Sequence, residues 1–297
     1  VELRGLDGPL SYLTVDDELP ETPRRGRVWA SPFVGRLDEQ NRIREFVDPT
    51  TTGESCVMIV QGEPGIGKSR LVHESLGGAA NLPKRNLLSV CSVYEQSDEM
   101  RAVRPFLSLN GSVISTDPRA RLRQLRADLV MLGLDPETHL PLLAPLLGLD
   151  PSTGYDPPAS DISRIRDLTV ESVRAWLGAA AAPGGVLVQI DDLQWADDAS
   201  RTLILGLAAR PIDGVRVLAT TRPDPRTSTG GRVEVIDLLP LGATHSLELA
   251  AHAVPGIGRD ALDHVLARGH GVPLFLEELA GMGEVAEVPP DMRARLS

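Results

Sequence analysis

The sequence is short of cysteine, aromatic residues and long hydrophobic runs. It has two cysteines, Cys56 and Cys91, which favour a reduced intracellular protein with two small buried thiols over a disulfide-linked one. Aromatic residues make up 3%, so the core must be built from Leu, Val, Ile and Ala. No apolar run could span a bilayer and no stretch has the pattern of a signal peptide. We therefore expect a cytoplasmic protein without a membrane partner.

Basic residues are also scarce. Lys and Arg total 30 against 41 Asp and Glu, for a net charge of −11. Proteins that bind nucleic acid or a membrane surface need a basic face, so this balance argues against both kinds of partner. Lys68 and Lys84 are the only lysines. The 297 residues are enough for one large domain and a smaller one.

Lys68 stands in a motif: Gly62-Glu63-Pro64-Gly65-Ile66-Gly67-Lys68-Ser69. It fits the phosphate-binding loop pattern of a glycine, four residues and Gly-Lys-Ser, between a predicted strand (56–60) and a predicted helix (70–76). Glycines let backbone N–H groups wrap an anion, and the helix start adds its dipole. Lys68 would neutralise the β- and γ-phosphates, Ser69 would ligate Mg²⁺, and Arg70 completes the nucleotide-contacting set. The alternative is a fortuitous glycine-rich turn.

Two carboxylates follow the predicted strand Val186–Ile190. Beside a phosphate-binding loop, Asp191 would hold Mg²⁺ through its water shell, and Asp192 would orient or deprotonate the attacking water. The alternative is a turn whose aspartates cap the next helix.

The predicted strand that starts at Val215 ends in hydroxyls and Arg222. Ligands of open α/β sheets lie at the carboxyl ends of the strands, so Arg222 would reach the γ-phosphate and stabilise charge during transfer. The alternative is a solvated loop arginine before a proline.

The order of elements predicts an α/β fold. Strands at 56–60, 86–91, 186–190, 215–223 and 233–238 alternate with helices, including one at 161–182, while 101–147 is mostly helical. This alternation predicts a central parallel sheet of about five strands flanked by helices. Helices at 243–254, 259–269 and 273–283 predict a small C-terminal helical subdomain. We expect an ATPase domain over 32–238 and the subdomain over 239–297.

The ends of the chain predict neighbours. Residues 1–14 suggest a β-hairpin with Asp7-Gly8 as its turn, and 15–31 a linker. A helix that opens at Asp291 looks cut short. We expect a fragment of a longer protein, with residues 1–31 as the end of an upstream domain.

Taken together, these motifs resemble the STAND class of P-loop ATPases, which are related to AAA+ proteins, in the branch of MalT-like regulators. Cys91–Gln96 and Leu140–Leu149 look most like the ATPase module that follows class III adenylate cyclase domains, and residues 1–14 are similar to the last hairpin of such a cyclase. The motifs that carry the resemblance are Phe33–Arg36, Gly62–Ser69, Asp191–Asp197, Thr221–Pro223 and Gly271–Leu279.

The resemblance implies further roles. Val34, Gly35 and Arg36 would lie against the adenine and ribose, Pro273 would close over the base from the helical subdomain, and Arg222 would sense the γ-phosphate. In this family ADP holds a closed form, and ATP with an inducer opens it for self-association. A cyclase-like domain would lie upstream, and a winged-helix domain would start near Ser297.

The sequence thus predicts Mg²⁺-dependent ATP binding and slow hydrolysis, as a nucleotide switch in a multidomain bacterial signalling protein. ATP or ADP and Mg²⁺ are the expected cofactors. One alternative is a non-hydrolysing scaffold, stapled by bound nucleotide, that regulates an attached cyclase or transcription-regulator domain. The residues present cannot perform cyclase chemistry. The acidic net charge and the Gly-x-Pro turn disfavour a DNA-remodelling AAA+ ATPase.

Overall fold

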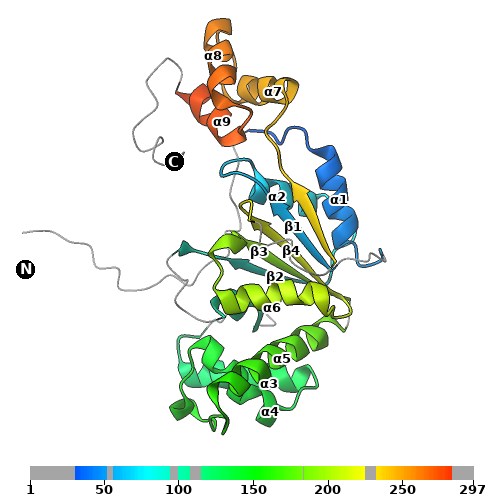
Figure 1. Cartoon of the computed structure of the whole chain (residues 1–297), viewed down its shortest axis with the longest axis vertical. Coiled ribbons are helices and arrows are strands. Elements are labelled where there is room, and N and C mark those ends of the chain that lie inside the picture. Colours follow the sequence, from blue (N-terminus) through cyan, green and yellow to red (C-terminus); the bar gives the residue numbers. More distant parts are fainter. Residues whose placement is uncertain are drawn as a thin grey trace, which may run out of the picture. The chain divides into compact units, whose positions relative to one another are not determined.

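The computed structural model describes residues 31–51, 56–93, 100–107, 115–182, 184–224 and 232–282 (Figure 1). The chain divides into two units, Val1–Ala30 and Ser31–Ser297, and every described residue belongs to the second. The predicted hairpin at 1–14, nearly all of the linker at 15–31 and the helix predicted from Asp291 lie outside the described residues.

Helices separate each strand from the next as far as β4, β5 follows β4 with no described helix between them, and the described elements after β5 are helical. In chain order they are α1 (Leu37–Val47), β1 (Val57–Gln61), α2 (Lys68–Gly77), β2 (Arg85–Val90), η2 (Arg101–Leu107), α3 (Pro118–Met131), α4 (Pro136–Leu143), η3 (Pro145–Leu147), η4 (Pro151–Thr153), α5 (Ile162–Ala181), β3 (Val186–Asp191), η5 (Leu193–Trp195), α6 (Asp198–Ala209), β4 (Val215–Thr221), β5 (Val233–Asp237), α7 (Ala243–Ala253), α8 (Arg259–Gly269) and α9 (Pro273–Gly281).

The sheet of the described chain has five strands in the order β2-β3-β4-β1-β5, and all neighbours are parallel. β1 lies between β4 and β5, where Val57 pairs with Val217 on one side and Val233 on the other. The carboxyl ends of β1, β3 and β4 therefore meet at one edge. The predicted α/β class with a central parallel sheet of about five strands is confirmed.

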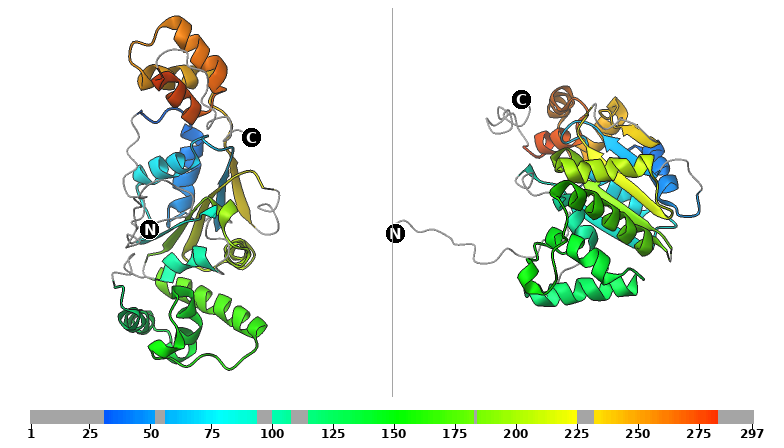
Figure 2. Two further views of the ribbon diagram at one scale, coloured as in Figure 1. Left: turned by 90° about the vertical axis from the view of Figure 1, so that its left-hand side faces the viewer. Right: turned by 60° about the horizontal axis from the view of Figure 1, so that its bottom comes forward.

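Side chains alternate between the two faces of the sheet, as the strand period requires. Val57 and Ile59 belong to a core shared with α5 and α6, whereas Met58 and Val60 belong to a core shared with α1 and α2. The sheet thus lies between two helical layers (Figures 1 and 2). Strands buried on both faces explain the continuous apolar runs in the sequence.

Residues 101–147 were predicted to be mostly helical, and the part of this range that the structure describes, 101–107 and 115–147, is. Asp-Pro pairs start three of the elements between β2 and α5: proline pre-sets the first helical φ, and the aspartate side chain accepts hydrogen bonds from backbone N–H groups of the first turn. These pairs are Asp117-Pro118 of α3, Asp135-Pro136 of α4 and Asp150-Pro151 of η4. Prolines here open helices more often than they interrupt them.

α5 was predicted over 161–182 and runs from Ile162 to Ala181. Its buried face begins only at Thr169, and Ile162, which fits the apolar spacing, is 87% exposed. Trp176 is fully buried, and its Nε1–H donates to the Phe106 carbonyl at 2.8 Å. The apolar period therefore identifies the helix but misplaces the start of its core.

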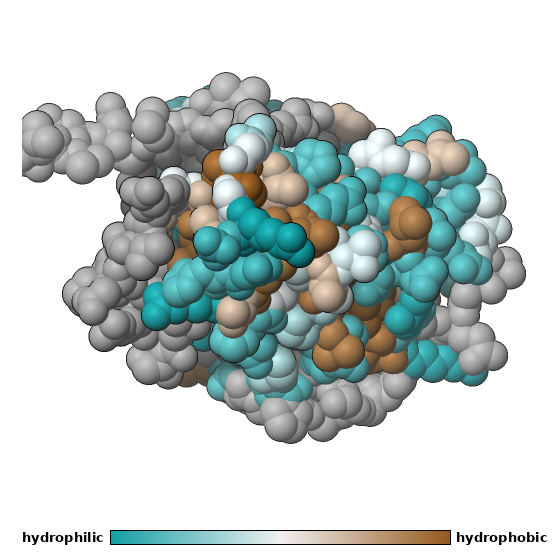
Figure 3. Space-filling view, turned by 90° about the horizontal axis from the view of Figure 1, so that it is seen from above, coloured by the Kyte–Doolittle hydropathy of each residue, from teal (hydrophilic) through white to brown (hydrophobic). Residues whose placement is uncertain are grey.

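The helices after β5 form the predicted helical subdomain. α7, α8 and α9 share their own small core, which also takes in Val34 from the segment before α1. Figure 3 looks onto this end of the molecule, where hydrophobic residues form separate small groups between hydrophilic ones.

Both cysteines are free: Cys91 is buried and Cys56 is half-buried. Burial raises the pKa of the Cys56 thiol, whose Sγ–H donates to the Leu207 carbonyl. In the part of the chain that the structure describes, no helix is both long enough and apolar enough to cross a membrane.

Replacing Trp176 with Ala should lower the free energy of unfolding by about 3–5 kcal/mol, because it leaves a large cavity and an unpaired carbonyl. Urea unfolding measures this. Ile162→Ala on the same helix is the control and should change stability by less than about 0.5 kcal/mol. Equal losses in the two variants would contradict the described core.

Candidate nucleotide-binding site

The segment between β1 and α2 is a tight loop built on glycine. Gly65 and Gly67 have φ of 76° and 97°, in the left-handed region that favours glycine. A side chain at Gly62 would bring its Cβ within 2.8 Å of the Leu238 carbonyl oxygen. The Lys68 ammonium donates to the Gly62 and Glu63 carbonyls at 2.8 and 3.1 Å. The loop therefore curls around its lysine.

The start of α2 leaves donors over for an anion. Leu71 makes the first bond of the helix to the loop, from its N–H to the Gly67 carbonyl at 2.8 Å. The N–H groups of Lys68 and Ser69 precede that bond, at the start of the helix, where backbone N–H groups have no acceptor within the helix. With the helix dipole they suit a negative ligand. The strand–loop–helix context required by the motif is present, which disfavours a fortuitous turn.

Ser69 and Asp191 meet although they lie 122 residues apart in the chain. The Ser69 hydroxyl lies 2.8 Å from Oδ1 and 3.0 Å from Oδ2 of Asp191. Thr220, near the end of the neighbouring strand β4, also donates its hydroxyl to Oδ1 of Asp191. Hydroxyl and carboxylate oxygens are the ligands that Mg²⁺ prefers. The residues present therefore fit a magnesium site at the end of the loop.

Asp192 follows directly in a left-handed conformation, with φ 60° and ψ 48°. Its N–H donates to Thr220 Oγ1 at 3.0 Å. The helix-capping alternative is wrong: the side chain of Asp192 caps no helix, and α6 is capped by Asp197, which accepts from the Ser200 N–H at 2.9 Å. Both carboxylates at the end of β3 remain available for other chemistry.

Arg222 lies just beyond the end of β4. Its side chain is exposed, as the loop alternative expected, and its guanidinium carbon lies 5.4 Å from the centre of the Trp195 ring. Its backbone N–H donates to Gln194 Oε1 at 3.0 Å. Gln194 thus connects the backbone of Arg222 to Asp192, and the sensor role of Arg222 stays a prediction.

The electrostatics of Lys68 connect these groups. Burial lowers the pKa of its ammonium, the charges of Asp192 and Asp191 raise it, and the charge of Arg222 lowers it. Three of the other four residues predicted to carry the chemistry therefore lie within electrostatic reach of Lys68. The fifth, Ser69, touches Asp191 directly.

The segment predicted to hold the base lies on the other side of the loop. Val34 is buried in the helical subdomain, and the ring of His245 would meet a side chain at Gly35. Arg36 has a left-handed backbone and donates to the carbonyls of Ile66, at 3.2 Å, and Leu239, at 2.9 Å. Arg36 thus ties this segment to both the loop and the link to α7.

Pro273 opens α9 against the loop. Its ring is the nearest group to a Cβ built at Gly67, at 4.0 Å, and the Leu274 N–H lies 3.3 Å from the Gly65 carbonyl oxygen. The space between has a volume of about 20 Å³ and is lined by residues of the loop, the segment before α1, α2, α7 and α9. That is room for roughly one water molecule, so a base would enter only if α9 moved.

Residues 32–219, which are more than half of the chain, match the family model described as the AAA ATPase domain. The chain belongs to the AAA ATPase domain family.

Two solved structures illustrate what this AAA ATPase domain is similar to. A signal transduction ATPase with numerous domains (STAND) and a tetratricopeptide repeat sensor, from Pyrococcus horikoshii, has a TM-score of 0.49 at 19% identity, covering 91% of this chain and 34% of its own. The Orc1 protein of Aeropyrum pernix, solved in complex with DNA, has a TM-score of 0.44 at 14% identity, covering 90% and 66%.

Among curated proteins, an uncharacterized protein of Rhizobium meliloti is 27% identical over 285 residues, which is 90% of this chain and 26% of that protein. This chain thus spans about a quarter of the length of that relative.

Arg70 was predicted to contact nucleotide, but its side chain is engaged elsewhere. It forms an ion pair with Glu277 of α9 at 3.1 Å, donates to the Ser31 carbonyl, and lies 5.7 Å from the centre of the Phe33 ring. A long flexible side chain such as that of Arg70 turns toward a nearby opposite charge. No local sequence pattern shows that this charge, Glu277, lies on α9.

Two residues without an assigned role join this AAA ATPase site. Thr220 donates its hydroxyl to the carboxylate of Asp191 and accepts from the backbone N–H of Asp192, and Gln194 bonds the side chain of Asp192 and the backbone of Arg222. The hydroxyls at the end of β4 gave a signal for Thr220. Gln194 lies two residues after Asp192, and the 3₁₀ turn η5 brings its side chain back to the side chain of Asp192.

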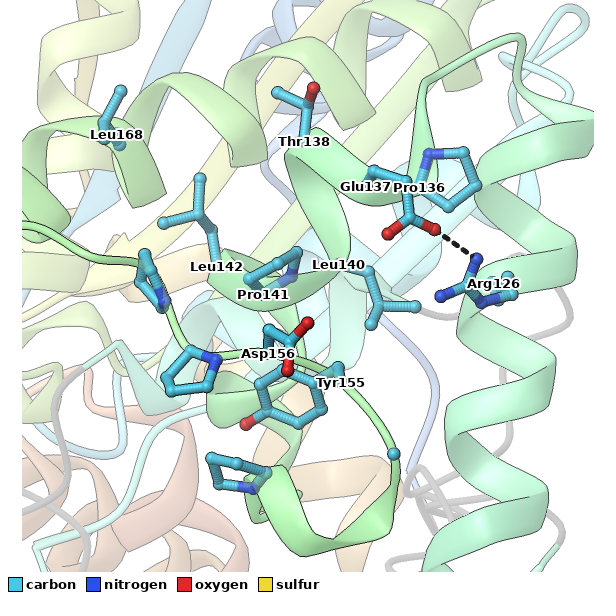
Figure 4. A pocket seen from close by; sticks show the side chains of 14 residues that line it. Arg126, Pro136, Glu137, Thr138, Leu140, Pro141, Leu142, Tyr155, Asp156 and Leu168 are labelled. Atoms are coloured by element: carbon cyan, nitrogen blue, oxygen red, sulfur yellow. Dashed lines mark hydrogen bonds and ion pairs between the residues drawn. The ribbon is translucent and has the colours of Figure 1, made fainter.

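A second cavity is lined by none of these residues. It measures about 630 Å³ and opens between α3, α4, η4 and the start of α5 (Figure 4). Arg126 and Glu137 pair beside it at 2.7 Å, and prolines and Tyr155 form much of its wall. The candidate nucleotide site is therefore identified by the phosphate-binding loop and the carboxylates of Asp191 and Asp192, and not by the volume of a cavity.

Stability should depend on pH through Lys68. Burial holds its folded-state pKa below the ordinary 10.5, so between those two values the unfolded chain binds more protons and stability rises with pH. Without nucleotide, wild type should gain stability relative to Lys68→Ala as the pH rises from 7.5 to about 10.5. Urea unfolding at several pH values measures this.

Lys84→Ala, at the other and exposed lysine, is the control and should follow wild type at every pH. Parallel curves for wild type and Lys68→Ala would contradict a buried, destabilised ammonium.

Proposed function

We propose that this AAA ATPase domain binds Mg²⁺ and ATP and hydrolyses ATP slowly, as a nucleotide-dependent switch of a multidomain bacterial signalling protein. The observation that carries the proposal is the contact of Ser69 with Asp191, 2.8 Å apart beside the phosphate-binding loop. A hydroxyl from the loop and a carboxylate from β3 are the pair that binds Mg²⁺ in P-loop ATPases.

Binding of the phosphates would use the loop amides and Lys68. The ammonium, which now donates to two loop carbonyls, would turn to the β- and γ-phosphates and so recover a counter-charge. Ser69 and Asp191 would hold Mg²⁺, which when bound neutralises phosphate charge. Val34, Gly35 and Arg36 would hold the base and ribose, with Pro273 closing over them.

Turnover would rest on Asp192 and Arg222. Asp192 would orient the attacking water or take its proton, and Arg222 would stabilise the charge that develops on the γ-phosphoryl group. The electrostatic contact of both residues with Lys68 supports placing them around one phosphate. A site of this kind works by position and charge, with no covalent intermediate on the protein.

The switch would act through α9. This helix contacts the loop at Gly65 and pairs with α2 through Arg70 and Glu277, so loop and helical subdomain share an interface at the nucleotide. Since the space there is too small for a base, binding would have to shift α9. A nucleotide that favours one position of α9 shifts the population toward it.

The same contacts favour a second candidate. If nucleotide binds but is not hydrolysed, it would staple the loop to α9 and leave a static scaffold that regulates an attached cyclase or transcription-regulator domain. A phosphate-release assay with Mg²⁺ separates the two candidates, because the scaffold predicts binding without turnover.

The wider setting belongs to the proposal too. We expect a cyclase-like domain and linker ending near residue 31, the ATPase domain over 32–238, and the helical subdomain over 239–297 running into a winged-helix domain. We also expect a cytoplasmic location, nucleotide-dependent self-association and no direct binding of nucleic acid. The large unmatched part of the Rhizobium meliloti relative leaves room for such domains.

Lys68→Ala should abolish nucleotide binding, because it removes the buried positive charge that faces the phosphates. Calorimetric titration with ATP and Mg²⁺ measures this, with Lys84→Ala as the matched control that keeps wild-type affinity. Unchanged ATP affinity in Lys68→Ala would sink the assignment of the loop.

Asp192→Asn should keep ATP affinity and lower turnover by about 100-fold or more, because the amide cannot take a proton from water. Phosphate release under enzyme excess measures this. Asp198→Asn, in the first turn of the next helix, is the control and should hydrolyse at the wild-type rate. A wild-type rate in Asp192→Asn would show that another group activates the water.

A further inference from the structure

Gln194 connects the carboxylate of Asp192 to the backbone of Arg222. Its Nε2 lies 2.9 Å from Asp192 Oδ1, and its Oε1 lies 3.0 Å from the Arg222 nitrogen. Its two ends thus reach the group predicted to activate water and the residue predicted to sense the γ-phosphate. The sequence gives Gln194 no role beyond its place in a motif.

The two bonds fix which way the amide of Gln194 points. The backbone N–H of Arg222 can only donate, so the group that faces it must be the amide oxygen. The NH₂ group then has to face Asp192, where an ionised carboxylate accepts. Reversing the amide would lose both bonds, so Gln194 is held in one orientation.

Asp192 is constrained from two directions. Its left-handed backbone is a costly conformation for a residue with a side chain, and the N–H bond to Thr220 holds it. The bond from Gln194 occupies Oδ1 of the carboxylate. Backbone and side chain are fixed together, and Oδ2 and the second lone pair of Oδ1 can still accept from a water. Strain of this kind is often kept where function requires it.

The turn that carries Gln194 is itself anchored. Leu193 is buried, and the Trp195 N–H donates to the Asp192 carbonyl at 2.9 Å. The Arg201 guanidinium donates to the carbonyl of Gln194 at 3.1 Å and pairs with Asp224 at 3.2 Å, and both charged side chains are 12% exposed. Gln194 therefore projects from a turn that its neighbours hold in place.

The same turn also contacts the side chain of Arg222. The Trp195 ring faces the guanidinium at 5.4 Å, a cation–π distance. Gln194 thus holds the backbone of Arg222 and Trp195 its side chain. One turn of three residues links the predicted base and the predicted sensor.

We propose that Gln194 is a positioning residue for hydrolysis, which aims the carboxylate of Asp192 at the attacking water and sets its place relative to Arg222. The proposal rests on the proposed ATPase function. Gln194 acts through Asp192, so its loss should slow turnover without loosening nucleotide binding. A purely structural hydrogen bond would instead change stability and affinity.

The test uses Gln194→Leu, which keeps the volume and loses both bonds, in the full 297-residue chain. We expect kcat to fall about 10- to 100-fold, because a misplaced catalytic group costs this much. The Kd for ATP with Mg²⁺ should stay within about threefold, a small free-energy change. Gln189→Leu, at a glutamine of strand β3 that bonds Asn86, is the matched control and should keep wild-type kcat and Kd.

The second arm combines Gln194→Leu with Asp192→Asn. If Gln194 works through Asp192, the double variant should hydrolyse no more slowly than Asp192→Asn alone in single turnovers with γ-labelled ATP. Gln194→Glu serves if the leucine variant does not fold, and should lower kcat at least as much, since its carboxylate repels that of Asp192.

If the wild-type chain hydrolyses ATP, any of three results for Gln194→Leu would overturn this proposal and leave the proposed ATPase function standing. These are an unchanged kcat, a loss of ATP binding together with kcat, or a further equal loss of kcat in the Asp192→Asn background. A wild-type chain that binds ATP without hydrolysing it would overturn the proposed ATPase function and this inference with it.

Discussion

The contact between Ser69 and Asp191 is the interaction on which the rest of the site depends. It joins the loop after β1 to the end of β3, with Thr220 of β4, the strand between them, bonded to the same carboxylate. It exists because parallel strands bring their carboxyl ends to one edge of the sheet. The charges of Asp192 and Arg222 act on Lys68 through the same geometry. Without the strand order β3-β4-β1, these residues would be unrelated positions in the chain.

Much of the fold could be predicted, because its signals are local. Apolar runs marked all five strands, and the change to short helices after β5 marked the helical subdomain. The start of the α5 core could not be predicted, since the exposed Ile162 has the same spacing as the buried Val173. Which residues a helix buries depends on what packs against it, and the helices around α5 come from other parts of the chain.

The candidate site divides in the same way. Ser69 and Asp191 could be predicted because backbone geometry alone places them, and the structure brings them into contact. The direction of the Arg70 side chain could not, because the charge that attracts it, Glu277, lies 207 residues away on α9. The link from Gln194 to Arg222 depends on a single turn whose course is set by tertiary contacts with Arg201. Backbone-placed groups were thus foreseeable, and long side chains were not.

The account's central claim is that Ser69 and Asp191 form the magnesium site of an ATP-binding loop. Calorimetric titration of the chain with ATP, in Mg²⁺ and again in EDTA, tests it most directly, with Asp191→Asn alongside. The account predicts one ATP per chain, tighter binding in Mg²⁺ than in EDTA, and a loss of that difference in Asp191→Asn. No binding of ATP, or a Mg²⁺ effect that survives in Asp191→Asn, would contradict it.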